Sequence, residues 1–357
     1  MNTIKHPGEL IAPELVNAIR NVAAEAEQLK QLHPVQLAII HEEKWFQLFV
    51  PEQYNGLALS LPEALQMEEA LAWTDGSVGW TVTLCAGAGW FVGFFDPATA
   101  ADFFNTPLVC LAGSGKTTGV AAITNDGYEI NGKWDYATGA NHATAFTANC
   151  MIEENGVLLK NTDDSPVIIP FIFLNSEVTV HENWKRIGMI ATGSNSFEVK
   201  AIRVNPNRAF HIDQRYAVLK EPVYQYPFLQ FAETTLAVNS SGMAMRFLDL
   251  CKILFEQKAT AAMQLSLNKA VEKIETARQE FYDVVNDSWA QCSTGLYISH
   301  EQLQLVSTVS RQLAITSRKL VDELYPYCGM QAANPDTEIN RVWRNLHTAS
   351  QHSLFVR

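Results

Sequence analysis

Residues 110–119, CLAGSGKTTG, form a glycine-rich string ending in Lys116 and Thr117, residue types that hold the phosphates of a nucleoside triphosphate. A working phosphate loop needs the pattern Gly-x-x-x-x-Gly-Lys-Ser/Thr followed directly by a helix, because the amides of the helix N-terminus bind the phosphates. Here Cys110 occupies the position of the first Gly, and a β-prone run and a turn follow the string. The sequence therefore indicates a connection between strands and not a triphosphate site.

A second stretch with chemically active side chains is INRVWRNLHTASQH, residues 339–352. A helix advancing about 100° per residue would carry one stripe of polar side chains there: Arg341, Arg344, Thr348 and His352. On this interpretation His352 is either a helix-terminal imidazole stabilised by the helix dipole, or a proton donor that titrates near neutral pH. His347 points elsewhere, and the nine histidines form no His-x-x-x-His pattern, so we expect no metal site.

The composition is that of a globular protein able to bury a large core. The chain has 357 residues, of which 47% are hydrophobic and 18% charged, enough for two or three domains. A formal net charge of -12 argues against a nucleic-acid or membrane surface, because phosphates need a basic face. The N-terminus does not resemble a signal peptide, and no later apolar stretch approaches the roughly 18 residues of a membrane helix. We therefore expect a cytoplasmic protein. The six cysteines are expected to be buried reduced thiols.

The residue pattern changes twice along the chain, which predicts three domains: 1–107, 108–210 and 211–357. The first domain reads as helices, and the second as short β-prone runs separated by Asp-Gly and Asn-Gly turns. The third returns to a helical period in stretches that suit a four-helix bundle: about 228–256, 258–292, 300–327 and 336–353. The expected fold class is α+β multidomain, with an N-terminal helical domain, a central antiparallel β-barrel or sheet, and a C-terminal four-helix bundle.

Two helix starts in the first domain can be assigned to single residues. Ser60 and Glu63 have the spacing of a capping box, in which each side chain bonds the other's backbone amide. Asp75 or Ser77 precedes the next helix, which is apolar and rich in tryptophan. These signals place the loop VPEQYNGLALS before the first of the two helices.

Four strings, taken in this order, resemble the acyl-CoA dehydrogenase superfamily over nearly the whole chain: VPEQYNGL, MEEALAWTDGSVGW, DGYEINGKWDYATGANHA and WKRIGMIATGSNSFEV. Within that superfamily the closer likeness is to the flavin-dependent monooxygenases, such as dibenzothiophene monooxygenase and the aromatic and steroid-ring hydroxylases. The resemblance implies FMN or FAD as cofactor, with reduced flavin supplied by a separate flavin reductase. It also implies a hydrophobic or aromatic small-molecule substrate, and a homodimer or homotetramer.

The C-terminal segment separates the two branches of the superfamily. The dehydrogenases often carry a carboxylate base here, and counting from Arg344 in the same way reaches Ser353, with no acid after Glu338. A lone serine cannot remove a thioester α-proton. The monooxygenases that this chain resembles have Trp-Arg-Asn or Trp-Arg-Asp and a His facing the flavin, which residues 343–345 and His352 match. A monooxygenase is the main hypothesis; a dehydrogenase with a relocated base and a non-catalytic binding or assembly module are the alternatives.

The resemblance assigns flavin contacts to the central domain. Trp134 would pack near the isoalloxazine ring, or else belong to the core of the sheet. Thr138 would hydrogen-bond flavin N5, while Gly139 lets the backbone approach closely; a turn threonine is the alternative. Thr192 and Ser194 mark a second turn, where the family contacts the flavin or its phosphate.

Further candidates follow from the same resemblance. Gly113 and Ser114 lie where the family places a loop that meets the flavin rim or its phosphate. Trp80 and Trp90 either line the substrate cavity or belong to the core of an apolar helix.

On the helical segments, Arg344 is placed with the cofactor-binding residues. His352 is assigned as a catalytic proton donor or hydrogen-bond partner, together with Thr138. Arg278 lies near the position where dehydrogenases bind the adenine half of FAD, although the residues around it do not match that motif.

Overall fold

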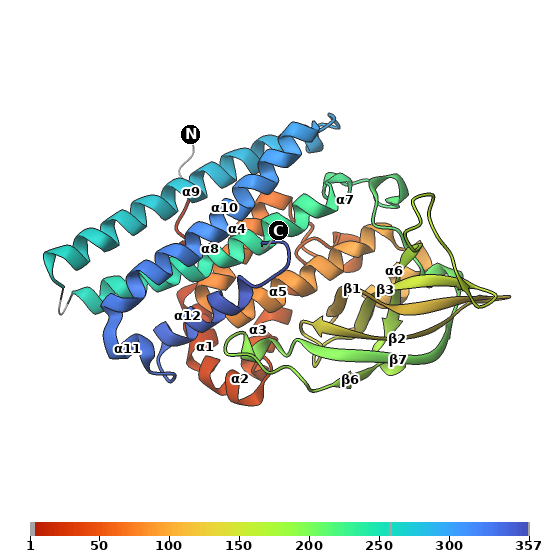
Figure 1. Ribbon diagram of the computed structural model, residues 1–357, viewed down its shortest axis with the longest axis horizontal. Coiled ribbons are helices and arrows are strands. Elements are labelled where there is room, and N and C mark those ends of the chain that lie inside the picture. The colour runs from red at the N-terminus through yellow and green to blue at the C-terminus, as the bar shows by residue number, and fades with distance from the viewer. Residues whose placement is uncertain (1–3, 257–258, 356–357) are drawn as a thin grey trace.

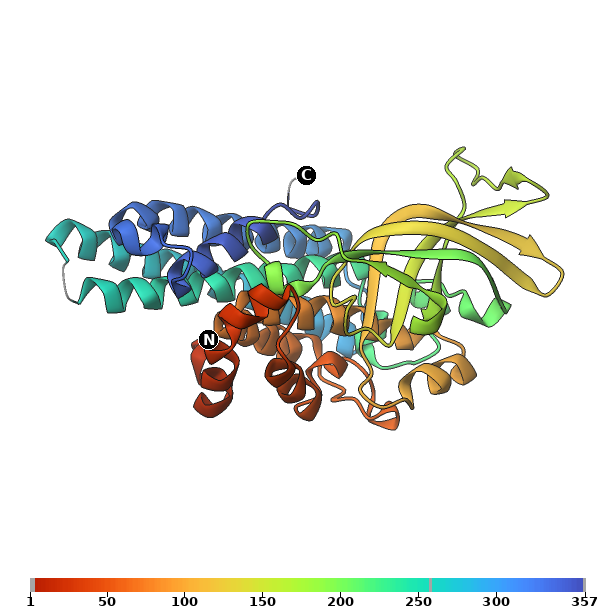
Figure 2. The same cartoon turned by 90° about the horizontal axis from the view of Figure 1, so that it is seen from below.

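The computed structural model describes residues 4–256 and 259–355. Long helices occupy one side of the molecule and a twisted sheet the other, and the N-terminal helices lie against the bundle (Figures 1 and 2). The N-terminal helices are α1 Pro13–Asn21, α2 Ala23–Leu29, α3 Pro34–Glu42, α4 Leu61–Thr74, α5 Gly76–Gly89 and α6 Pro97–Phe104. A 3₁₀ turn, Trp90–Phe94, continues directly from α5.

The predicted helix starts are confirmed. The Ser60 amide donates to the Glu63 carboxylate at 2.9 Å, which completes the capping box of α4. The Asp75 carboxylate accepts from the amides of Ser77 and Val78 at 3.0 Å each and so caps α5. These contacts satisfy amides that the helices cannot satisfy internally.

The central sheet has the strand order β4-β3-β1-β2-β7-β6, with β5 paired to β3. Its strands are β1 Leu111–Thr124, β2 Gly127–Ala137, β3 Ala145–Glu154, β4 Val157–Leu158, β5 Ile168–Leu174, β6 Thr179–His181 and β7 Asn195–Val204. The expectation of an antiparallel sheet is wrong at one pairing, because β1 and β3 run parallel. The string that resembled a phosphate loop lies in β1 with no helix after it, so it cannot bind a triphosphate in that way.

The C-terminal helices are α7 Pro222–Gln225, α8 Phe228–Phe255, α9 Ala261–Ser293, α10 His300–Leu324, α11 Gly329–Ala333 and α12 Glu338–Ala349. Helices α8, α9, α10 and α12 correspond to the four predicted stretches, which confirms the bundle. The fourth stretch is shorter than expected. It ends at Ala349, so His352 lies in the turn after α12 and not on its polar stripe.

The hydrophobic core forms two clusters and does not follow the three predicted domains. One cluster of buried side chains joins the N-terminal helices to the bundle, and a second, separate cluster fills the sheet. Helix α4 packs along α8 so closely that a side chain at Gly242 would overlap the backbone of Glu69. The sheet begins at Leu111 and ends at Val204, and the two helical segments on either side of it share one core, so the division into three domains stays a prediction.

Helix α5 and the turn after it, Gly76–Phe94, are long and apolar enough to cross a membrane, contrary to the expectation from the sequence. Most of this segment is buried within the protein. It packs against α4, α8 and β1, between the bundle and the sheet (Figure 1). A helix that is buried over most of its surface is apolar over most of its surface, which explains its composition.

A buried ion pair ties the shared helical core together. The Arg278 guanidinium donates to both carboxylate oxygens of Glu69, at 2.7 and 2.8 Å, and both side chains are almost fully buried. The hydroxyls of Tyr282 and Ser241 donate to the same carboxylate. Arg278 is thus engaged inside its own chain, which corrects its suggested contact with FAD across a subunit boundary.

Removing Arg278 would leave the Glu69 charge buried without its partner. We expect Arg278→Met to lower the free energy of unfolding by about 3–5 kcal/mol, measured by urea denaturation. Arg203→Met is the control, because Arg203 pairs with Glu129 while 81% exposed, and its loss should cost less than about 1 kcal/mol. The double variant Glu69→Gln/Arg278→Met should recover part of the loss. Equal effects of the two arginine substitutions would contradict this account.

His142, in the turn between β2 and β3, gives the fold a dependence on pH. Its Nε2 atom is buried with no hydrogen-bond partner. Burial, and secondarily the neighbouring His41, lower the pKa of His142 to about 4. The unfolded chain therefore takes up a proton near pH 6.5 that the folded chain accepts only near pH 4.

We expect the stability of the protein to fall as the pH drops from about 6.5 to 4, with His142 contributing at most ~3 kcal/mol. His142→Asn should remove this part of the slope and leave the stability above pH 7 nearly unchanged. Urea denaturation at a series of pH values tests this. Parallel pH profiles for the two proteins would show that His142 is not responsible.

Candidate functional site

Helix α5 has one face that is packed less tightly than the others. Leu84 and Gly87 are half-buried, and Trp80 keeps 8% of its surface exposed, on a helix that is otherwise almost wholly buried. Their spacing places the three residues on one side of the helix. A Cβ atom added at Gly87 would have only Phe231 within reach, at 4.0 Å. This face therefore has room beside it.

His352 covers one end of this face. Its ring lies 6.0 Å from the Trp80 ring, centroid to centroid, in an edge-on arrangement, and Phe355 lies on its other side at 6.5 Å. The His352 amide donates to the carbonyl of Ala349, which folds the chain back after α12. The structure thus brings together two predicted site residues, Trp80 and His352, although a turn and not a helix positions the histidine.

A chain of three buried hydroxyls lies on the neighbouring side of α5. The Thr138 and Ser194 hydroxyl oxygens are 2.8 Å apart, and those of Ser194 and Thr192 are 2.7 Å apart. Thr192 also lies within hydrogen-bond distance of the Met189 carbonyl, at 2.8 Å. Gly139, with φ +76°, packs so closely on α5 that a Cβ atom there would lie 2.7 Å from the Cys85 sulfur. Four residues predicted separately from two strings are therefore neighbours.

The direction of these hydrogen bonds decides what Thr138 can offer. Each hydroxyl has one hydrogen to donate. Thr192 donates its hydrogen to the Met189 carbonyl, so its oxygen accepts from Ser194, and the Ser194 oxygen accepts from Thr138. The hydrogen of Thr138 is therefore used within the chain. Its oxygen keeps a lone pair that can accept a hydrogen bond from a bound molecule.

Sequence reasoning missed an exposed aromatic and cationic group beside these hydroxyls. The Tyr136 ring is half exposed, and Trp184 meets it edge-on at 6.3 Å. The Lys116 ammonium lies 4.6 Å from the centre of the Tyr136 ring and bonds Asp135 at 2.8 Å, and Arg186 stacks on Trp184 at 5.0 Å. Lys116, set aside as part of a false motif, thus takes part in a surface cluster.

A bulge explains why Trp134 was chosen and Tyr136 was not. The register of β2 against β7 shifts between Trp134 and Ala137, and Tyr136 has a positive φ of 68°. Trp134 points into the sheet core, fully buried, where it stacks on Phe197 at 5.2 Å. A ring with no exposed surface cannot touch a bound flavin, so the flavin contact assigned to Trp134 is wrong. Tyr136 turns outward at the bulge.

Trp90 is also a core residue. It is 1% exposed, its indole donates to the Val223 carbonyl at 2.8 Å, and it stacks on Phe231 at 4.8 Å. The substrate-lining assignment therefore fails for Trp90, while Trp80 keeps its place beside His352.

Gly113 and Ser114 lie within β1 and not in a loop. Gly113 faces Thr147 of the parallel strand β3, where any side chain would overlap the threonine. The Ser114 hydroxyl donates to the Asp135 carbonyl at 2.7 Å. Paired strands do not present the free amides of an anion-binding loop, so the loop expected here is absent.

Arg344 is a structural clamp and not a cofactor ligand. Its guanidinium donates to the Glu27 carboxylate at 2.9 and 3.1 Å, to the Ile187 carbonyl at 2.6 Å and to Asn340 at 2.7 Å. A side chain at Gly188 would overlap the Arg344 carbonyl, which shows how tightly the loop before β7 rests on α12. With these four hydrogen bonds, the Arg344 guanidinium joins α12 to α2 and to this loop.

Glu68 is a buried carboxyl group without an ion-pair partner in the described chain. It is fully buried on α4, and neither of its oxygens makes a hydrogen bond of good geometry. Burial raises the pKa of Glu68 well above its usual value, and the nearby hydroxyl of Thr83 on α5 only partly offsets this. Burial therefore favours the protonated form of Glu68.

The residues around Thr138 fit a flavin. The half-exposed Tyr136 ring offers an aromatic surface, Thr138 offers a hydroxyl, and Lys116 and Arg186 offer positive charge for a phosphate. The less tightly packed face of α5 lies next to them through Thr81 and Cys85, which meet Gly139. The arrangement can therefore place a flavin edge near an apolar space that His352 also borders.

Comparison with known proteins gives a consistent picture. The family model "Acyl-CoA dehydrogenase, C-terminal domain" matches residues 229–357. The chain is 24% identical to HsaA of Mycobacterium tuberculosis, the oxygenase subunit of a flavin-dependent monooxygenase, over 95% of this chain and 89% of that protein. It is 23% identical to indole-3-acetate monooxygenase of Pseudomonas putida, over 87% of this chain and 80% of that protein.

Solved structures share the fold along almost the whole chain. The crystal structure of the Mycobacterium tuberculosis HsaA monooxygenase superposes with a TM-score of 0.88 at 22% identity, covering 96% of this chain and 91% of that one. XiaF from Streptomyces sp., solved with FADH2 and glycerol, gives 0.86 at 19% identity with the same coverage. Residues 229–357 thus match the acyl-CoA dehydrogenase C-terminal domain family, and the chain as a whole is similar in sequence and in fold to flavin-dependent monooxygenases.

Proposed function

We propose that this protein is the oxygenase component of a two-component, flavin-dependent monooxygenase that hydroxylates a hydrophobic, aromatic substrate. The observation that carries the proposal is the placement of two groups on adjacent sides of α5. Thr138, with its hydroxyl chain, lies against Thr81 and Cys85, and His352 lies against Trp80. One helix thus joins a hydroxyl group for the flavin edge to an apolar space with an imidazole at its end.

Each part has a distinct task. Bound reduced flavin supplies the electrons and the oxygen chemistry for hydroxylation. The Thr138 oxygen would accept a hydrogen bond from the N5–H of reduced flavin, and Tyr136 would lie against the ring. Trp80 and Leu84 keep water away from the substrate, because an apolar wall excludes competing proton donors. His352 donates or accepts the proton exchanged at the reacting atoms.

The same geometry argues against the acyl-CoA dehydrogenase alternative. A dehydrogenase needs an ionised carboxylate as base, and Glu68 is the candidate for a relocated one. Burial raises the pKa of Glu68 and favours its protonated form, which is the wrong state for a base. The other buried acids in the described chain pair with arginines or cap a helix: Glu69, Asp75 and Glu233.

Several finer points extend the proposal. FMN and FAD are both candidates for the flavin, because the described residues around Thr138 suit the ring and a phosphate that the two share. A separate flavin reductase would deliver it in the reduced form, as the oxygenase-subunit name of the relative HsaA suggests. We further expect a cytoplasmic homodimer or homotetramer.

The Thr138 hydroxyl tests the flavin contact. We expect Thr138→Val to weaken the binding of reduced FMN or FAD about 5-fold, the effect of one hydrogen bond, in anaerobic fluorescence titrations. Thr138→Ser should bind like the wild type. Thr118→Val is the matched control, because the Thr118 hydroxyl likewise makes one hydrogen bond within the sheet domain, to the Lys133 carbonyl, but lies on an exposed part of β1. If neither flavin binds in either redox state, the non-catalytic alternative replaces the proposal.

His352 tests the chemistry. With reduced flavin, air and 4-ethylphenol or indole as probes, we expect His352→Ala to form at least about 10-fold less hydroxylated product per flavin oxidised. Oxygen should instead appear as hydrogen peroxide, and flavin affinity should not change. His347→Gln is the control, since His347 bonds Asp322 at 2.7 Å on another side of α12. Anaerobic reduction of bound FAD by acyl-CoA thioesters would favour the dehydrogenase instead.

A further inference from the structure

Two cysteines meet far from the candidate site, at the end of the bundle. Cys251 lies in α8, and Cys328 ends the 3₁₀ turn Tyr325–Cys328 between α10 and α11. Their sulfur atoms are 3.4 Å apart, although 77 positions separate them in the chain. Both are free thiols and both are buried. Neither contributes to the site around α5.

The two thiols are not equivalent. The hydrogen bond between the sulfurs lowers the pKa of Cys328 and raises that of Cys251. This is the pattern expected when the Cys251 S–H donates to the Cys328 sulfur, because the donor stabilises the thiolate that accepts. Cys328 is therefore the sulfur that ionises first, and the thiolate is the reactive form of cysteine.

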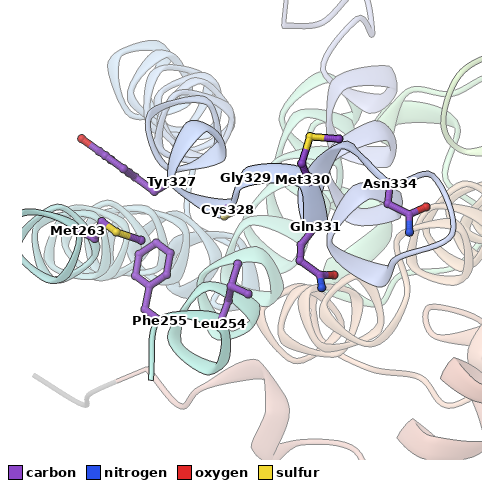
Figure 3. A pocket seen from close by; sticks show the side chains of 9 residues that line it. All are labelled: Leu254, Phe255, Met263, Tyr327, Cys328, Gly329, Met330, Gln331 and Asn334. Carbon is purple, nitrogen blue, oxygen red and sulfur yellow. The ribbon is translucent and has the colours of Figure 1, made fainter. Parts of the chain in front are cut away.

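A cavity reaches the same sulfur. It has a volume of about 530 Å³ and lies between the end of α8, the start of α9 and the corner where α10 meets α11 (Figure 3). Cys328 and Gly329 line it together with apolar side chains that include Leu254, Phe255 and Met263, whereas Cys251 does not line it. A molecule the size of hydrogen peroxide fits this volume easily, since a water molecule occupies about 30 Å³. Access and acidity thus favour the same cysteine.

We propose that Cys328 and Cys251 form a peroxide-sensitive dithiol, in which Cys328 is attacked first and Cys251 resolves it. The Cys328 thiolate attacks one oxygen of hydrogen peroxide, the O–O bond breaks, and a sulfenic acid and hydroxide form. The Cys251 sulfur then attacks the sulfenic sulfur, forming the S–S bond as water leaves. In total, two thiols are oxidised to one disulfide, and one peroxide is reduced to two waters.

The proposed function would supply this oxidant, and in that respect the inference rests on it. A monooxygenase produces hydrogen peroxide whenever it reduces oxygen without hydroxylating its substrate. The disulfide would then form in protein molecules that have released hydrogen peroxide instead of hydroxylating their substrate. The sensitivity of the thiol pair is nevertheless a property of the bundle alone and can be measured without flavin.

The geometry allows the bond with small movements. The sulfurs must approach from 3.4 Å to about 2.05 Å. Cys328 is followed directly by Gly329, which has a φ of +59° and no side-chain contact that a Cβ atom would disturb. The disulfide would tie α8 to the corner that leads through α11 into α12, and so to the turn carrying His352.

The chain contains its own comparison pair. Cys85 and Cys110 are also buried neighbours, and their contact and burial raise the pKa of Cys110 well above its usual value. Neither lines the cavity. Because Cys110 is harder to ionise and the cavity reaches neither cysteine, this pair should stay reduced under conditions that oxidise Cys251 and Cys328.

The experiment treats the flavin-free, full-length protein with graded hydrogen peroxide and follows intact mass and proteolytic peptides. The wild type should lose two hydrogens and yield one crosslink, between the peptides of Cys251 and Cys328. Cys251→Ser should stop at a sulfenic acid that dimedone traps on Cys328, and Cys328→Ser should form neither product. Cys110→Ser, the matched control, should behave like the wild type. Cys328→Ala replaces the serine variant if that protein does not fold.

A crosslink at Cys85–Cys110 at the same peroxide concentration, or unchanged peroxide consumption by Cys328→Ser, would overturn the inference. So would a wild type that keeps all six thiols while a control peptide thiol is oxidised. Because these measurements need no flavin, they separate the two proposals. A disulfide that forms in a protein unable to bind flavin would refute only the proposed function, and hydroxylation by a protein with inert thiols would refute only this inference.

Discussion

The position of α5 between bundle and sheet is the constraint on which the candidate site depends. Side chains are excluded at two of its glycines: one at Gly79 would overlap Ala72 of α4, and one at Gly76 would press on Met243 of α8. These close contacts fix the helix from the bundle side. Gly139 fixes it from the sheet side by packing on Cys85. The hydroxyl chain and the imidazole therefore keep their relation to each other because both rest on the same immobile helix.

Two arginine–glutamate ion pairs hold other helices of the molecule together. Arg344 binds Glu27 and the Ile187 carbonyl, so α12 is held to α2 and to the loop before β7. The Glu69–Arg278 pair holds α4 to α9. Both arginines had been considered as flavin ligands, and both are structural. Around Thr138, the described residues offer aromatic rings and hydroxyl groups to a ligand. Exposed Lys116 and Arg186 add positive charge there.

The sequence predicted the helices and the bundle well because their signals are local. A capping box at Ser60 and a capping Asp75 act within one turn, and the long amphipathic stretches act within one helix. The resemblance assigned Thr138 and Ser194 to flavin contacts, and the structure places their hydroxyl oxygens 2.8 Å apart. It failed at two local irregularities. A bulge in β2 leaves Trp134 pointing into the core and turns Tyr136 outward. Helix α12 ends at Ala349, so His352 lies beyond the helix. The parallel pairing of β1 with β3 was equally invisible, because it joins segments across an intervening hairpin.

The core shared by the first and last thirds of the chain has a consequence during synthesis. Glu69 and Arg278 are 209 positions apart, and α4 has no partner for its inner face until α8 and α9 exist. At about 5–20 residues per second, a ribosome takes on the order of 10–40 s to cover that distance. Throughout this time the apolar α5 is exposed, and it is hydrophobic enough to be mistaken for a membrane segment. We therefore expect the nascent chain to need chaperones until α8 and α9 have been synthesised and can cover the apolar helices.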